Sequence, residues 1–143
     1  MFRKILVPVI GSQADEEVIK LACRLARQDK SEIRALHIIT VKRDLPLDAE
    51  VAPEIQKAED ILEHIETVAE KENYKVDTNL LQARQVGQAI VDEAMKQETD
   101  LILMGLSYKR RFGEFSLGDV VPYVLKNAPC CVILYQRPGE LEV

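Results

Sequence analysis

The chain has few of the residues that build metal centres or hydrolytic active sites. Its 143 residues include three cysteines and two histidines. Cys23, Cys130 and Cys131 lack metal-ligand spacing, and an odd count with an adjacent pair favours reduced, packed thiols over disulfides. His37 stands in an apolar segment and His64 on an expected helix, and the sequence identifies no nucleophile or ligand set beside either. We therefore predict no catalytic residue, no metal site and no enzymatic activity.

Long apolar runs and an excess of positive charge are also missing. No apolar segment approaches the roughly 20 residues that cross a bilayer. Residues 1–9 lack a separate apolar stretch followed by a small-residue cleavage site. The net charge of −5 and the isoelectric point near 5.1 argue against a broad nucleic-acid surface, because duplex binding requires a net basic face. We expect a cytoplasmic protein that neither inserts into a membrane nor binds nucleic acid.

Strand and helix patterns alternate along the whole chain. With 47% hydrophobic and 30% charged residues and no repeat or linker, residues 1–143 are expected to form one domain with one core. Short β-prone segments are expected at residues 4–9, 33–41, 76–82, 101–104 and 131–135, with helical spacing between them. Single helices between strands require right-handed crossovers. The pattern predicts a doubly wound α/β fold, with a five-stranded, mostly parallel sheet and helices on both faces.

The segment that follows the fourth expected strand has the composition of an anion site. The strand ends at Gly105, whose missing side chain lets a ligand approach the backbone, and Gly118 opens a short helix with free N–H groups. Between the two glycines lies a basic run of Lys109, Arg110 and Arg111. A plain surface connection, with glycines for turns and basic residues for solubility, fits the periodicity equally well.

Three segments and one spacing resemble the universal stress protein family. The stretches KILVPVIGS (residues 4–12), ALHIIT (35–40) and NAPCCVILY (127–135) are similar to its first strand and turn, its second strand and its last strand. Its nucleotide-binding members carry glycine, two residues, glycine, nine residues, then glycine and a serine or threonine. Here the same frame holds Gly105, Tyr108, Gly118 and Asp119. The resemblance covers nearly the whole chain and implies the family's fold.

The resemblance also implies a site for an adenine nucleotide, ATP or AMP, in the loops after the first, second and fourth strands. Ligands of such sheets bind where the strand order reverses. The candidate nucleotide-binding residues are Pro8, Val9, Ile10, Gly11, Ile38, Met104, Gly105, Ser107, Tyr108, Lys109, Arg110, Gly118, Asp119 and Val120. Ile38 would meet the adenine or ribose, and Met104, Gly105, Gly118 and Val120 would line the ribose and phosphates.

Three positions depart from the family's binding pattern. Ile10 stands where the nucleotide binders have an aspartate, and it cannot accept a hydrogen bond. Asp119 replaces the hydroxyl residue; its carboxylate is expected to cap the helix and to repel a phosphate from the same N–H groups. Tyr108 replaces the middle glycine with a bulky ring. We therefore predict a regulatory module that binds its nucleotide weakly or with altered selectivity.

Two alternatives stay open at this point. Lys109, Arg110 and Arg111 could close over the phosphates while Tyr108 stacks on a base, which would rebuild the site with a different selectivity. The second alternative is a domain that has lost the nucleotide and acts through a regulatory protein partner.

The last expected strand is predicted to form a homodimer interface. Its residues are Cys131, Val132, Ile133, Leu134 and Tyr135, a β-prone and mainly apolar run. An unpaired edge of this kind invites pairing with a second strand, and the fifth strand of the resembling family pairs with its counterpart. The alternative is a strand covered by residues 136–143.

Overall fold

A parallel sheet of five strands forms the centre of the molecule. The computed structural model describes residues 1–49, 52–107, 110–111, 114–115 and 119–137. The strands are β1 (Lys4–Pro8), β2 (Glu32–Thr40), β3 (Val76–Ala83), β4 (Leu101–Ser107) and β7 (Cys131–Arg137), in the order β3-β2-β1-β4-β7. Every pairing in this sheet is parallel. The expected five-stranded α/β sheet is confirmed.

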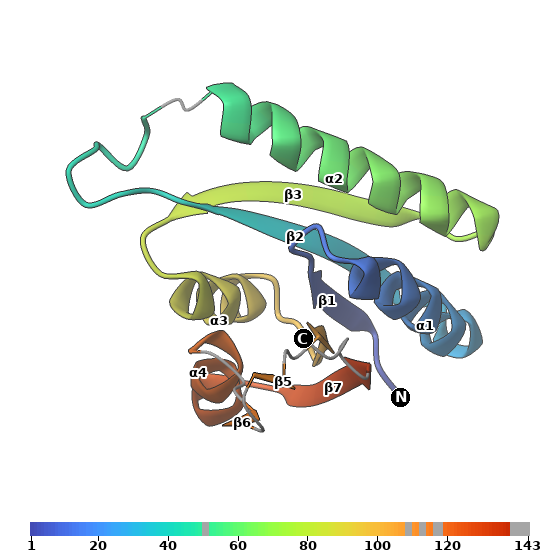
Figure 1. The fold of residues 1–143 in the computed structure, drawn as a ribbon. Helices are drawn as coiled ribbons and strands as arrows, with labels where there is room; N and C mark the ends of the chain where they lie inside the picture. The colour runs from blue at the N-terminus through green and yellow to red at the C-terminus, as the bar shows by residue number, and fades with distance from the viewer. Residues whose placement is uncertain (50–51, 108–109, 112–113, 116–118, 138–143) are drawn as a thin grey trace.

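Four helices cover the two faces of this sheet. They are α1 (Gln13–Asp29), α2 (Ala52–Lys71), α3 (Val86–Lys96) and α4 (Val120–Asn127). Figure 1 shows α1 and α2 on one face and α3 and α4 on the other. Side chains alternate accordingly: Ile5 and Val7 of β1 join the core under α1 and α2, and Leu6 joins the core under α3 and α4. Within the described residues, no helix is long and apolar enough to cross a membrane.

The strand order reverses between β1 and β4. From β1 the chain continues to β2 and β3 on one side, and it later adds β4 and β7 on the other side. The carboxyl ends of β1, β2 and β4 therefore lie at the same edge of the sheet, next to the start of α4. In open α/β sheets this switch point is where ligands bind.

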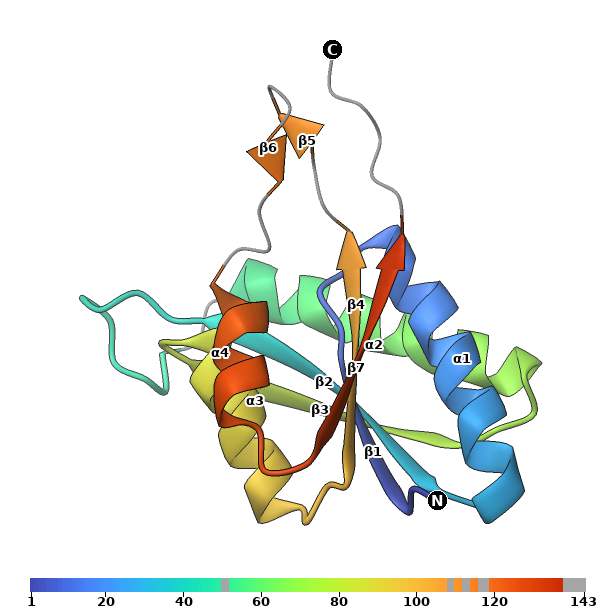
Figure 2. The same ribbon diagram turned by 90° about the horizontal axis from the view of Figure 1, so that it is seen from below.

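The segment after β4 differs from the expected basic loop. Strand β4 continues beyond Gly105 to Ser107, because residues 105–107 pair with Tyr135, Gln136 and Arg137 of β7. The chain then forms a short antiparallel pair, β5 (Arg110–Arg111) and β6 (Glu114–Phe115), which projects beyond the ends of β4 and β7 (Figure 2). Two-residue strands carry no readable periodicity, so the sequence could not indicate this hairpin.

Candidate functional site

Four candidate residues lie on the α3 and α4 side of the switch-point edge, and a fifth, Ile10, follows β1 at this edge. Met104 is 5% exposed and belongs to the apolar cluster of that face, and Ile38 and Val120 pack against the cluster. Pro8 follows Leu6 by two residues along β1, which places it on the same face. Ile10, two residues further on, is 68% exposed. We call Pro8, Ile10, Ile38, Met104 and Val120 the switch-point site.

Three other candidates face the opposite side, where α1 and α2 fill the space. Val9 is buried in the core beneath these helices. A Cβ atom added to Gly105 would lie 2.6 Å from Val18 Cγ2 of α1, and one added to Gly11 would lie 2.9 Å from Ile61 Cδ1 of α2. The space that Gly105 leaves is therefore taken by a helix. Close packing of α1 is a sufficient reason for a glycine at this position.

The turn between β1 and α1 uses its backbone polar groups internally. The Val9 N–H donates to Leu36 O at 2.9 Å, and Val9 O lies 2.8 Å from His37 Nδ1. The carboxylate of Asp15 accepts hydrogen bonds from the N–H groups of Ile10 at 3.1 Å, Gly11 at 2.6 Å and Ser12 at 3.1 Å. We call residues 10–12 with the Asp15 carboxylate the Asp15 turn.

Neither Asp15 nor His37 is among the candidate site residues named from the sequence. One signal for Asp15 was available: an acid three residues after Ser12, at the start of a helix, has the spacing of a capping box. His37 had no such signal, because its contact with Val9 O depends on the pairing of β1 with β2.

The Asp15 carboxylate is nearly inaccessible, with 6% of the residue exposed. Burial raises the pKa of Asp15 above its ordinary value of 3.8, and this outweighs the opposing effect of the three N–H donors and of His37. The positive end of the α1 dipole lies at the same place and favours the charged form. The turn thus holds a desolvated negative charge close to the switch-point site.

We expect the free energy of unfolding to change with pH because of the shifted pKa of Asp15. Because the raised pKa means that the folded state favours the protonated carboxyl, Asp15 stabilises the fold most at low pH, and this contribution is lost as the pH rises above 3.8 through the folded pKa. The free energy of unfolding of Asp15→Asn, measured in urea, should therefore rise relative to the parent as the pH increases. A difference that stays constant with pH would contradict the shifted pKa.

Asp119 does not cap α4, so that expectation was wrong. The residue is exposed and directly precedes the helix, but its side chain makes no capping hydrogen bond. Its backbone has φ −94° and ψ −27°, which is helical. A capping side chain needs an extended backbone to reach over the first N–H groups, and Asp119 does not have one. Its charge still lies at the end of the helix where a phosphate would be attracted.

The structure describes the remaining candidate residues only in part. Tyr108, Lys109 and Gly118 lie outside the described residues. Ser107 ends β4 and Arg110 begins β5, and both are placed by their backbone alone. Across the described ranges, no group of three or more histidine, cysteine, aspartate or glutamate residues is placed to hold a metal ion. The three cysteines are free thiols.

A parallel five-stranded sheet with helices on both faces and a strand order that reverses between β1 and β4 defines a doubly wound α/β protein. A match to the Universal stress protein family spans residues 1–136. The chain therefore belongs to the universal stress protein family.

Known proteins similar to this chain carry the same family name. Universal stress protein MJ0531 of Methanocaldococcus jannaschii is 29% identical over 98% of this chain and 85% of its own length. A universal stress protein structure from Archaeoglobus fulgidus has a TM-score of 0.78 at 23% identity and covers 94% of this chain and 98% of its own. An Archaeoglobus fulgidus structure in complex with dAMP has a TM-score of 0.73 at 23% identity and covers 92% and 96%. The structural likeness shows a shared fold.

Proposed function

We propose that the protein is a cytoplasmic, non-catalytic regulatory module that binds an adenine nucleotide, ATP or AMP, at the switch-point site and passes the signal to a protein partner. The observation that carries the proposal is the position of Pro8, Ile38, Met104 and Val120 on one side of the edge where strand order reverses, with Ile10 exposed just after β1. The dAMP bound to a solved relative supports an adenine ligand.

The residues of the switch-point site and the adjacent Asp119 explain why we propose weak or altered selectivity for the nucleotide. Apolar side chains offer a purine ring a surface without competing polar groups. Ile10 cannot accept a hydrogen bond from the ligand, and the Asp119 carboxylate stands at the helix end that would otherwise attract phosphate. Binding is therefore expected to rest on apolar contact more than on polar recognition, and to weaken as the ligand gains phosphate groups.

Restoring the two polar positions should strengthen ATP binding. We expect Asp119→Ser to raise the affinity for ATP about fivefold, because it removes a negative charge beside the phosphates, and Ile10→Asp in that background to raise it further. Titration calorimetry measures both steps. Asp44→Ser is the matched control, because Asp44 is exposed in the connection between β2 and α2, which extends away from β1 (Figure 1).

The location of the ligand is tested separately by chemical-shift mapping with ATP and AMP. Perturbations should centre on Ile10, Ile38, Met104 and Val120. Shifts centred on α2 instead, or a double variant that binds ATP no better than the parent, would contradict the proposed site. Native mass spectrometry of freshly purified protein would show whether a nucleotide is retained.

We also propose a homodimer formed through β7. This strand is the last in the sheet order, so among the described residues no strand lies beside one of its edges. Ile133 and Tyr135 pack toward α1 and α2, and Val132 and Leu134 pack toward α3 and α4. The Tyr135 hydroxyl donates to Glu17 Oε2 at 3.2 Å, which ties the strand to α1. A firmly held apolar edge strand is suited to pairing with a second copy.

Proline substitution in β7 tests the dimer. Neighbouring residues of a strand direct their N–H groups to opposite edges, so Val132→Pro and Ile133→Pro remove donors on opposite sides. One variant should lose its ladder bond to β4 and unfold more easily, and the other should fold normally but sediment as a monomer. Sedimentation across a range of protein concentrations and thermal melting separate the two effects. A parent protein that is monomeric at high micromolar concentration would refute the dimer.

A further inference from the structure

The part of the β2–α2 connection that leads toward α2 is held by Gln82 of β3. The amide nitrogen Nε2 of this side chain donates hydrogen bonds to Leu47 O at 3.1 Å and to Ala49 O at 2.9 Å. A side-chain NH2 group has two donors, so Gln82 uses both of them on the connection.

The part of the connection nearer to β2 is held by Arg84, which directly follows β3. The Nη1 atom of Arg84 donates to Lys42 O at 2.8 Å, and its Nη2 atom donates to Leu45 O at 3.0 Å. Because the guanidinium is planar and rigid, it fixes both carbonyl groups in one geometry. We call residues 42–49 the strap, and Gln82 with Arg84 the latch.

The strap is anchored by polar bonds and not by burial. Val41, directly before it, is 3% exposed, and its N–H group donates to Ala83 O at 2.8 Å. From residue 42 to residue 49, all of which the structure describes, no residue is buried. Exposed hydrogen bonds contribute little net stability, because water replaces them when they break. We therefore expect the strap to open at a lower free-energy cost than the sheet beside it.

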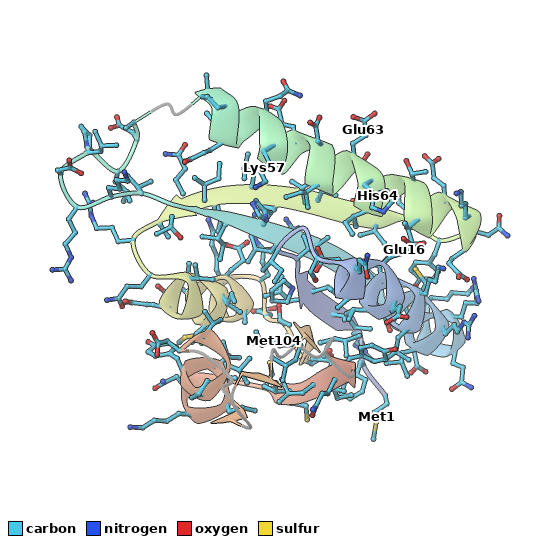
Figure 3. All side chains as sticks on the ribbon, in the orientation of Figure 1. Met1, Glu16, Lys57, Glu63, His64 and Met104 are labelled. Carbon is cyan, nitrogen blue, oxygen red and sulfur yellow. The ribbon has the colours of Figure 1, made fainter. Side chains whose placement is uncertain are left out.

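The closed strap forms one wall of a cavity of about 460 Å³. Leu47 lines the cavity from the strap, and Gln88 and Asp92 line it from α3. The five residues of the switch-point site, all of them described, do not line this cavity. Figure 3 shows Met104 of that site in the middle of the molecule, whereas the strap lies at the left edge. The cavity is therefore separate from the switch-point site.

We propose that residues 42–49 open and close as one unit, with Gln82 and Arg84 as the positioning residues that hold the closed state. Closing places Leu47 in the wall of the cavity. Opening removes this wall while β2 and β3 stay paired up to Thr40 and Ala83, where the strap begins. The protein thus has two states that differ in the shape of one surface, and this conformational device does not depend on nucleotide binding.

Trypsin cleavage after Lys42 and Arg43 measures the opening, because a protease cuts the open form of a segment. Gln82→Glu keeps the size of the side chain but replaces its NH2 group by oxygen, and Arg84→Ala removes the guanidinium. Each variant should be cut about tenfold faster than the parent, because the open form becomes more populated. Gln88→Glu is the matched control: it places the same new charge on the α3 wall of the cavity, and it should be cut at the rate of the parent.

The result for Gln82→Glu distinguishes one unit from two independent contacts. Gln82 holds the far end of the strap, whereas the cleaved bonds lie at its start, so only a strap that opens as a whole connects the two. Faster cutting of one latch variant alone, equal rates in the parent and both latch variants, or faster cutting of the control would overturn the proposal. Cleavage after Lys57, within α2, reports wider unfolding and should not increase. An equal rise there would show that the latch stabilises the whole fold, and it would also contradict the strap.

Discussion

Replacing Gly105 by alanine is expected to lower the free energy of unfolding by about 2 kcal/mol, because the added methyl group overpacks a tight contact. It would lie 2.6 Å from Val18 Cγ2 and 3.5 Å from Ala14 Cβ. Val18 belongs to α1, and its side chain is buried in the core, so it cannot move aside unless α1 shifts. Urea unfolding of the parent and the variant measures the loss.

A double-mutant cycle with Val18→Ala identifies the cause. On its own, Val18→Ala removes buried methyl groups and should destabilise the protein by about 1 to 3 kcal/mol. In the Gly105→Ala background it makes room for the new methyl group, so its cost should fall by at least about 1 kcal/mol. Strictly additive effects would mean that Gly105 is not required by helix packing. A ligand-based role of Gly105 would then regain support.

Gly11→Ala is expected to cost a similar 2 to 3 kcal/mol, roughly, for two combined reasons. The backbone at Gly11 has φ +88°, which L residues rarely adopt, and the new Cβ would lie 2.9 Å from Ile61 Cδ1. Any relaxation of this backbone also moves the N–H group that makes the 2.6 Å bond to Asp15. Chemical denaturation gives the stability change, and amide exchange of residues 10–12 reports the loosened turn.

Gly87→Ala is the matched control for Gly11→Ala. A Cβ at Gly87 would lie 3.0 Å from Tyr123 Cδ1, a contact almost as short as the one at Gly11. Gly87 does not have a positive φ, however, and it lies within α3, where the better helix propensity of alanine, up to about 1 kcal/mol, offsets part of the cost of the contact with the Tyr123 ring and Cβ. We expect a loss below about 1 kcal/mol. Equal losses at the two glycines would show that sterics alone, and not backbone strain at Gly11, determine the cost.

The edge at which the loops after β1, β2 and β4 meet was predictable from the sequence, and the packing around it was less so. Because the carboxyl ends of parallel strands share one edge, the loops after β1, β2 and β4 had to meet, and Ile38 and Met104 are found on the same face there. The cap expected from Asp119 fails because it depends on a backbone angle that residue identity does not determine. Val9 and Gly105 were assigned to the ligand site by their place in the motif. The structure places Val9 in the core beneath α1 and α2, and it places Val18 of α1 against Gly105, and neither contact can be read from the motif.

The sequence by itself determined the order of the five sheet strands and the helices between them, the parallel sheet and the membership of a family. These follow from local periodicity and from short motifs, because the alternation of apolar residues along a strand or a helix is read over a few neighbours. The tertiary structure alone decided that Val18 fills the space at Gly105, that His37 holds Val9 O, and that the Asp15 carboxylate lies buried in the turn that it caps. The first two contacts join residues 87 and 28 positions apart, and the burial of the third depends on how α1 and α2 pack over β1. Such contacts exist only once the crossovers have brought the elements together, so no local pattern encodes them.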